Sequence, residues 1–146
     1  MSNVNEQLNM TGHLQIRLND ELVRDVPNLV VTAGKGFVAT RMIGTGAGVM
    51  SHMEVGTGTT DPVAGNTALE TPVSSSRTAF TTSAAVSGAV VTYVTAFAAG
   101  TGTGALTEAG IFNASSGGTM LCRTEFAVVN KGASDTMTIT WTVTVS

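Results

Sequence analysis

The segment 136–145 alternates without interruption between threonine and a large apolar residue. Its apolar members are Met137, Ile139, Trp141, Val143 and Val145. Successive side chains of a β-strand point to opposite faces, whereas a helix would distribute the same residues around its circumference. The alternation therefore predicts a strand with one face in a hydrophobic core and the other face covered by hydroxyl groups.

The composition extends this prediction to the whole chain. Threonine and glycine are both abundant, at 24 and 17 of the 146 residues. Threonine is β-branched and suits the half-buried surface of a sheet, while glycine supplies tight turns. A chain of this length fits one domain. We therefore expect a single domain of many short strands joined by turns.

Other segments with strand character lie between turn-forming residues. The segments expected to form strands are 13–18, 22–26, 49–55, 77–83, 89–98, 105–113, 119–126 and 136–145. Turns are expected at 19–20, 87–88 and 115–118, which consist of Asn, Asp, Ser and Gly. This number and spacing of strands predicts an all-β fold, an antiparallel β-sandwich that is jelly-roll-like, with at most one or two short helices.

Residues 28–43 carry the clearest helical signal, because their apolar residues recur at helical spacing. Asn28 is a candidate N-cap, and Gly44 is a candidate end of the helix. Gly34 and Gly36 each cost about 0.5–1 kcal/mol relative to alanine inside a helix. The helix is therefore expected to be short or broken.

Residues 67–70 read Thr-Ala-Leu-Glu, which has the form of a capping box at a helix start. Pro72 follows closely, and proline cannot continue a helix. A single helical turn is expected here.

The first ten residues are polar, with isolated apolar residues at Val4, Leu8 and Met10. We divide the chain into a flexible N-terminal arm, residues 1–10, and a single β-sandwich domain, residues 11–146. An arm of this kind can become ordered on a partner. Val4, Leu8 and Met10 are therefore candidate partner contacts.

Charged residues make up 12% of the chain, about half the usual share for a soluble domain. The net charge is −3 and the seven basic residues are scattered, whereas a nucleic-acid partner requires a basic stripe. No nucleic-acid partner is expected. Charged groups keep free surfaces apart, so we expect a homo-oligomer that covers part of its surface with partners. A compact secreted β-domain coated with hydroxyl groups is the alternative.

The thirty residues Thr78–Thr107 contain no charged residue. The stretch is long enough to cross a membrane as a helix, but it is rich in Thr, Ser and Gly, and residues 85–98 alternate like a strand. No membrane partner is expected. Residues 1–10 also lack the basic start and apolar run of a signal peptide. The uncharged stretch is expected to form strands that are buried in the sandwich or in an oligomer contact.

Candidate catalytic groups are few. His13 and His52 lie inside alternating segments, and no His-x-His or Cys-x-x-Cys spacing indicates zinc. Cys122 is the single cysteine and is expected to be a small buried apolar residue. The glycine-rich segments 34–36 and 44–48 lack the Gly-Lys-Ser/Thr ending of a phosphate loop. We expect no catalytic residue, metal, cofactor or small-molecule substrate.

Glu108 and Glu125 lie in neighbouring expected strands, and a pair of carboxylates is the minimum equipment of a glycosidase. Pairing of these strands would also bring Glu108 near Arg123. We favour a structural Glu108–Arg123 ion pair that holds the hairpin. A carbohydrate-active β-sandwich enzyme is an alternative, although the chain has one Trp and one Tyr, and sugar sites usually use aromatic platforms.

Several sequence blocks, in this order, resemble the head cement (decoration) proteins of tailed bacteriophages. The blocks are VGTGTT (55–60), LTEAGIFN (106–113), GTMLCR (118–123) with Phe126, and TITWT (138–142). The resemblance covers roughly residues 28–146, and TEAGIF is its most specific part. Glu108, Gly110, Phe112 and Arg123 match the recurring pattern.

The resemblance implies a jelly-roll-like sandwich that binds the outside of the major capsid protein shell and clamps neighbouring subunits. It carries no catalytic residues. The expected location is the capsid exterior of a virion, after synthesis in the bacterial host cytoplasm. Similar blocks occur in tail fibre proteins, so a tail-tip or fibre domain that binds a host surface is a further alternative.

Overall fold

The alternating segment forms strand β9 (Met137–Val145), and its burial follows the predicted alternation. Trp141, at its centre, is fully buried, and the threonines between the apolar residues are half-buried. The strand pairs antiparallel with β1 (Met10–Leu18) on one side and with β6 (Val90–Phe97) on the other. The predicted strand, with one face in the core, is confirmed.

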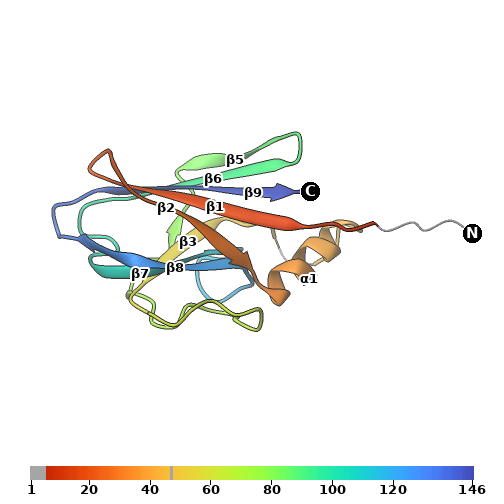
Figure 1. Ribbon diagram of the computed structural model, residues 1–146, viewed down its shortest axis with the longest axis horizontal. Coiled ribbons are helices and arrows are strands. Elements are labelled where there is room, and N and C mark those ends of the chain that lie inside the picture. The colour runs from red at the N-terminus through yellow and green to blue at the C-terminus, as the bar shows by residue number, and fades with distance from the viewer. Residues whose placement is uncertain (1–5, 47) are drawn as a thin grey trace, which may run out of the picture.

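The computed structural model describes residues 6–46 and 48–146. Within them, nine strands form one antiparallel sheet in the order β4-β3-β7-β8-β2-β1-β9-β6-β5 (Figure 1). The other strands are β2 (Glu21–Val30), β3 (His52–Gly56), β4 (Thr78–Ala79), β5 (Thr82–Ser87), β7 (Gly104–Phe112) and β8 (Met120–Lys131).

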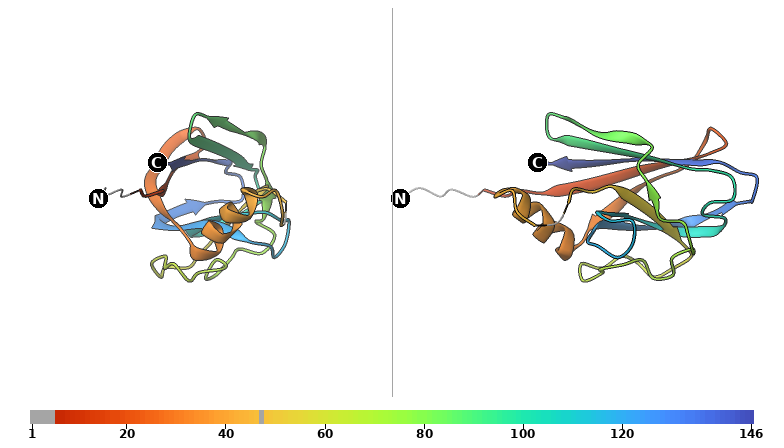
Figure 2. Two further views of the ribbon diagram at one scale, coloured as in Figure 1. Left: turned by 90° about the vertical axis from the view of Figure 1, so that its right-hand side faces the viewer. Right: turned by 180° about the vertical axis from the view of Figure 1, so that it is seen from behind.

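The sheet curls so that its two halves face each other (Figure 1, Figure 2). One layer contains β2, β1, β9, β6 and β5, and the other contains β4, β3, β7 and β8. The layers join at the end of β2, where Leu29 and Val30 pair with Arg123 and Cys122 of β8. Apolar side chains from both layers form one main core between them. The predicted all-β, antiparallel, sandwich-like fold is confirmed.

The predicted turns connect these strands. Asn19 and Asp20 join β1 to β2 with φ values of 49° and 68°, as a type I′ hairpin turn requires. Gly88, with φ of 59°, occupies the first central position of the turn between β5 and β6. This geometry fits a type II′ turn, which places glycine at that position.

The expected strand 77–83 is divided between the two layers. β4 pairs with β3, whereas β5 pairs with β6 in the opposite layer. Between them, Phe80 N donates to Ser51 O at 2.9 Å and Thr81 N donates to Val94 O at 3.0 Å. The chain therefore changes layers at these two residues.

The helix α1 (Thr32–Arg41) lies within the segment expected to be helical, at one end of the sandwich (Figure 2). The predicted N-terminal end is wrong, whereas the predicted C-terminal end is confirmed. β2 continues through Val30, and Asn28 Oδ1 accepts a hydrogen bond from Trp141 Nε1 at 2.8 Å instead of capping a helix. Gly44, with φ of 68°, closes the helix as predicted: its N–H donates to Arg41 O and Thr45 N donates to Thr40 O, both at 3.3 Å.

Gly34 explains how α1 packs on the sheet. A Cβ atom at this position would lie 2.1 Å from Leu121 O on β8. The helix therefore approaches the strand more closely than any residue with a side chain would allow. Gly36, two residues further along the helix and exposed, has no atom within 4 Å of such a Cβ.

The described part of the N-terminal arm ends against the C-terminus. Asn9 exchanges two backbone hydrogen bonds with Ser146, at 2.7 and 2.8 Å. Met10 begins β1 and pairs with Val145, inside the range assigned to the arm. Val4 lies outside the described residues.

Candidate functional site

Glu108, on β7, is fully buried and faces the long connection that follows β3. Its Oε2 accepts hydrogen bonds from Gly58 N at 2.8 Å and Thr71 N at 2.7 Å, and its Oε1 accepts one from Glu70 N at 2.9 Å. One carboxylate thus ties both ends of the loop 57–72 to the sheet. We call this loop the clamped loop.

Arg123, on β8, completes the arrangement. Its Nε and Nη2 both lie 3.0 Å from Glu108 Oε1, and both side chains are buried. Nη2 also donates to Thr60 O at 3.0 Å, and Nη1 donates to Asn66 Oδ1 at 3.2 Å. The structure therefore brings together the two residues of the expected ion pair. They hold the clamped loop as well as the hairpin of β7 and β8.

Two glycines make room for this carboxylate. A Cβ atom would lie 2.6 Å from Glu108 Oε2 at Gly56 and 2.5 Å from it at Gly58. From the sequence, residues 56–66 were expected to form a turn-rich connection, and VGTGTT (55–60) carried part of the resemblance. Two glycines one residue apart, followed by a glutamate in a later strand, were the available signal. Glycine has no side chain, so another side chain can approach its backbone closely.

The single helical turn predicted at 67–70 is wrong, because this segment belongs to the clamped loop. Glu70 Oε1 accepts hydrogen bonds from Thr59 N at 2.9 Å and Thr60 N at 3.3 Å, across the loop. Hydrogen bonds from Thr60 and Thr59 lower the pKa of Glu70. The loop is also held by Thr32 N, which donates to Ala64 O at 2.8 Å, and by buried Leu69.

The four residues that match the resemblance pattern, Glu108, Gly110, Phe112 and Arg123, are all buried. Phe112 packs under the guanidinium of Arg77, with 3.6 Å between Arg77 Cζ and the ring centroid. Their contacts in this chain therefore maintain the fold. Surfaces available to a partner lie elsewhere.

The two carboxylates weighed as a glycosidase pair do lie opposite each other, since Glu108 and Glu125 are partners in the ladder of β7 and β8. Both oxygens of Glu108, however, are occupied by N–H donors and enclosed. Glu108 is therefore arranged to hold backbone and presents no open carboxylate to a ligand.

The other candidate chemical groups are dispersed. His13 Nε2 contacts Asp25 Oδ1 at the surface, and His52 Nδ1 lies 2.6 Å from Ser51 Oγ. Burial, together with the charge of Arg77, lowers the pKa of His52. Burial also raises the pKa of the Cys122 thiol, which is fully buried as predicted. Among residues 6–46 and 48–146, no group of three or more His, Cys, Asp or Glu residues is placed to hold a metal ion.

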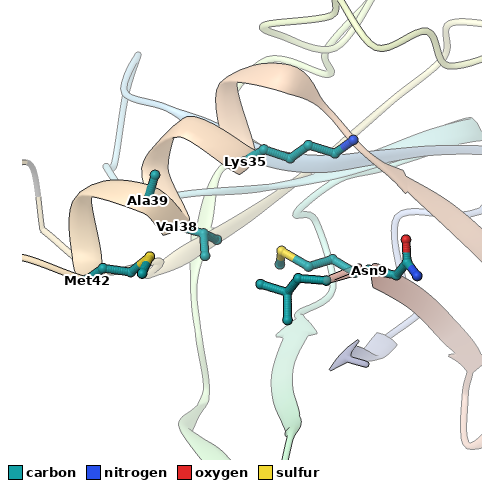
Figure 3. Close-up of a pocket in the computed structure, with 7 residues that line it drawn as sticks. Asn9, Lys35, Val38, Ala39 and Met42 are labelled. Carbon is teal, nitrogen blue, oxygen red and sulfur yellow. The ribbon is translucent and has the colours of Figure 1, made fainter. Parts of the chain in front are cut away.

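The first surface open to a partner is a groove between α1 and the segment that leads into β1 (Figure 3). It has a volume of about 300 Å³. It is lined by Leu8, Asn9, Met10, Lys35, Val38, Ala39 and Met42. We call it the terminal groove.

The terminal groove contains two of the three predicted contact residues, Leu8 and Met10. Leu8 is 74% exposed, and Met42, on the opposite wall, is 83% exposed. Ile43 follows at 76%. Met42 and Ile43 were not predicted as partner contacts, because apolar residues at helical spacing usually face a core.

The second open surface is the hairpin of β5 and β6. All six residues of β5 are exposed, so neither face of this strand is covered, whereas β6 is mostly half-buried. The hairpin lies in the uncharged stretch Thr78–Thr107. β5 is therefore not buried inside the sandwich, which was one of the two interpretations of that stretch.

Comparisons with known proteins returned no match: no family model, no curated protein and no solved structure is similar to the chain. In the described part of the chain, no helix has the length and apolar character needed to span a membrane.

Proposed function

We propose that the protein is a virion structural protein that binds the outside of a phage capsid shell and stabilises it by clamping adjacent major capsid subunits. The observation that carries this proposal is the cluster of exposed apolar side chains around the terminal groove. Leu8, Met42 and Ile43 are each about three-quarters exposed or more. Grouped apolar residues of this kind mark contact sites on soluble proteins.

The surface chemistry suits a packing role. The groove is lined mainly by aliphatic and methionine side chains, and methionine adapts its shape to an irregular partner. Lys35 is the one charged residue among its lining residues. The resemblance of the four sequence blocks to head cement proteins supports the same class of partner, the major capsid protein.

The mechanism follows from mass action. A protein that binds the assembled shell, and binds separate subunits weakly, shifts the equilibrium toward the shell. Many weak contacts over a repeating lattice add their effects through multivalency.

Co-sedimentation of the purified chain with capsid shells that lack it tests this function. Replacing Leu8 or Met42 with Ser should weaken binding about tenfold or more, since central apolar contacts dominate interface energies. The melting temperature of each variant should stay within about 2 °C of the parent, because both side chains are exposed. Val63→Ser, at another exposed apolar residue, is the matched control and should bind like the parent. Equal binding by all three variants, or no binding by the parent, contradicts the proposal.

A further inference from the structure

The unpaired edge of β5 is a second surface whose chemistry specifies its partner. β5 is the last strand of the sheet, so one row of its backbone N–H and C=O groups faces away from β6. An open row of this kind pairs with another extended backbone. The occupant must therefore be a strand.

Other long edges of this sheet are protected against such pairing. Along most of its length β2 pairs only with β1, and its sequence contains Glu21, Arg24 and Asp25 as well as Pro27. Arg24 further closes its other side by donating to Ala127 O and Val128 O of β8, at 2.8 and 2.6 Å. Charges and proline are the usual protection of an edge strand.

β5 has none of these features. Its sequence, Thr-Ser-Ala-Ala-Val-Ser, contains no charge and no proline, and all six residues are exposed. No charged residue lies within Thr78–Thr107. The hairpin also has its turn at the end of the molecule where α1 lies (Figure 1; Figure 2, right). A register irregularity lies between Thr82 and Ala85, whereas Ala85, Val86 and Ser87 pair regularly with β6 and present an edge without charge or proline.

We infer that two copies of this chain pair antiparallel through their β5 strands to form a two-fold dimer with a continuous sheet. The chain itself supplies a strand that matches this edge, and two uncharged strands meet without like-charge repulsion although each chain carries −3. The opposite edge, β4, has only two residues. Growth beyond the pair is thus disfavoured, and the assembly closes as a dimer.

The turn geometry identifies the backbone groups involved. Ser87 and Val90 flank the two-residue turn and form a hydrogen-bonded pair, so the next pair, Val86 and Val91, is the non-hydrogen-bonded kind. The backbone N–H of Val86 consequently points to the free edge. Val86→Pro removes this donor without removing a hydrogen bond to β6, and proline is tolerated in edge strands.

Sedimentation equilibrium of the purified full chain over a wide concentration range tests the dimer. We expect a reversible monomer–dimer equilibrium in the parent. Val86→Pro and Val86→Lys should raise the dissociation constant about tenfold or more, because each blocks edge pairing. Val63→Lys makes the same change of charge at an exposed valine outside the strand and should dimerise like the parent. Circular dichroism and Trp141 fluorescence verify that each variant is folded.

Amide hydrogen exchange gives an independent measurement that needs no substitution. The Val86 amide should exchange more slowly as the protein concentration rises, while the Glu21 amide of β2 should not respond. A parent that stays monomeric at all concentrations, or Val86 variants that dimerise as the parent does, overturns the inference. The dimer does not rest on the capsid role. A chain that binds shells as a monomer would refute the dimer and leave the proposed function standing.

Discussion

Glu108→Gln tests the clamped loop, because it removes the charge of a buried carboxylate and keeps its shape. The carboxylate uses both oxygens, since Oε2 accepts from Gly58 N and Thr71 N, and Oε1 accepts from Glu70 N and Arg123 Nε. A glutamine has one oxygen and one NH₂ group. Whichever way the amide turns, its NH₂ group faces two N–H donors that lose their acceptor.

The magnitude follows from these contacts. Each buried donor left without an acceptor costs about 1–3 kcal/mol, and removing one partner of a buried ion pair costs about 3–5 kcal/mol in total. A domain of this size loses about 2–4 °C in melting temperature per kcal/mol. We therefore expect a loss of about 3–5 kcal/mol in the free energy of unfolding, and a melting temperature lower by roughly 6–20 °C.

Urea unfolding followed by tryptophan fluorescence measures this loss, because Trp141 is the single tryptophan and is fully buried. Glu125→Gln is the matched control. Glu125 lies directly opposite Glu108 in the ladder but is partly exposed, so its substitution should change stability by less than about 0.5 kcal/mol. A loss below about 1 kcal/mol for Glu108→Gln, or equal losses for the two variants, would refute the clamp.

Two further predictions concern α1 and β6. Gly36→Ala should stabilise the protein by about 0.5–1 kcal/mol through helix propensity. Gly34→Ala should destabilise it by about 1–3 kcal/mol, because α1 must move away from Leu121. Equal effects of the two substitutions in urea unfolding would contradict the packing of α1. Burial, and to a smaller extent Cys122, raises the pKa of Tyr93, the single tyrosine, to about 12. Its pKa in the unfolded chain is about 10, so the unfolded state releases the proton first and stability falls as pH rises from about 10 to 12. Absorbance at the tyrosinate band should show ionisation well above pH 10 in the folded protein, and Tyr93→Phe should remove part of the alkaline loss of stability; ionisation near pH 10 before unfolding would contradict the burial of this side chain.

The sequence predicted the features that depend on local pattern. The period-two alternation of β9 and the turns at 19–20 and 87–88 were correct, because side-chain direction and turn geometry are local properties. Features that depend on a distant partner were wrong or missed. Asn28 caps no helix because its side-chain oxygen accepts a hydrogen bond from Trp141, which lies far along the chain.

The candidate site shows the same division. Glu108 and Arg123 could be expected to meet, since their strands form a hairpin. The role of the pair could not be predicted, because it depends on how residues 57–72 fold back over the strand. The exposure of Met42 and of β5 was also hidden, since an apolar or uncharged sequence does not reveal whether the fold covers it.

The proposed capsid role is tested most directly by counting this chain in purified virions by quantitative mass spectrometry beside the major capsid protein. The account predicts a copy number comparable to that of the major capsid protein, with the chain released when shells are dissociated. A handful of copies per particle would move the protein to the tail. Absence from purified particles would contradict the proposed function itself.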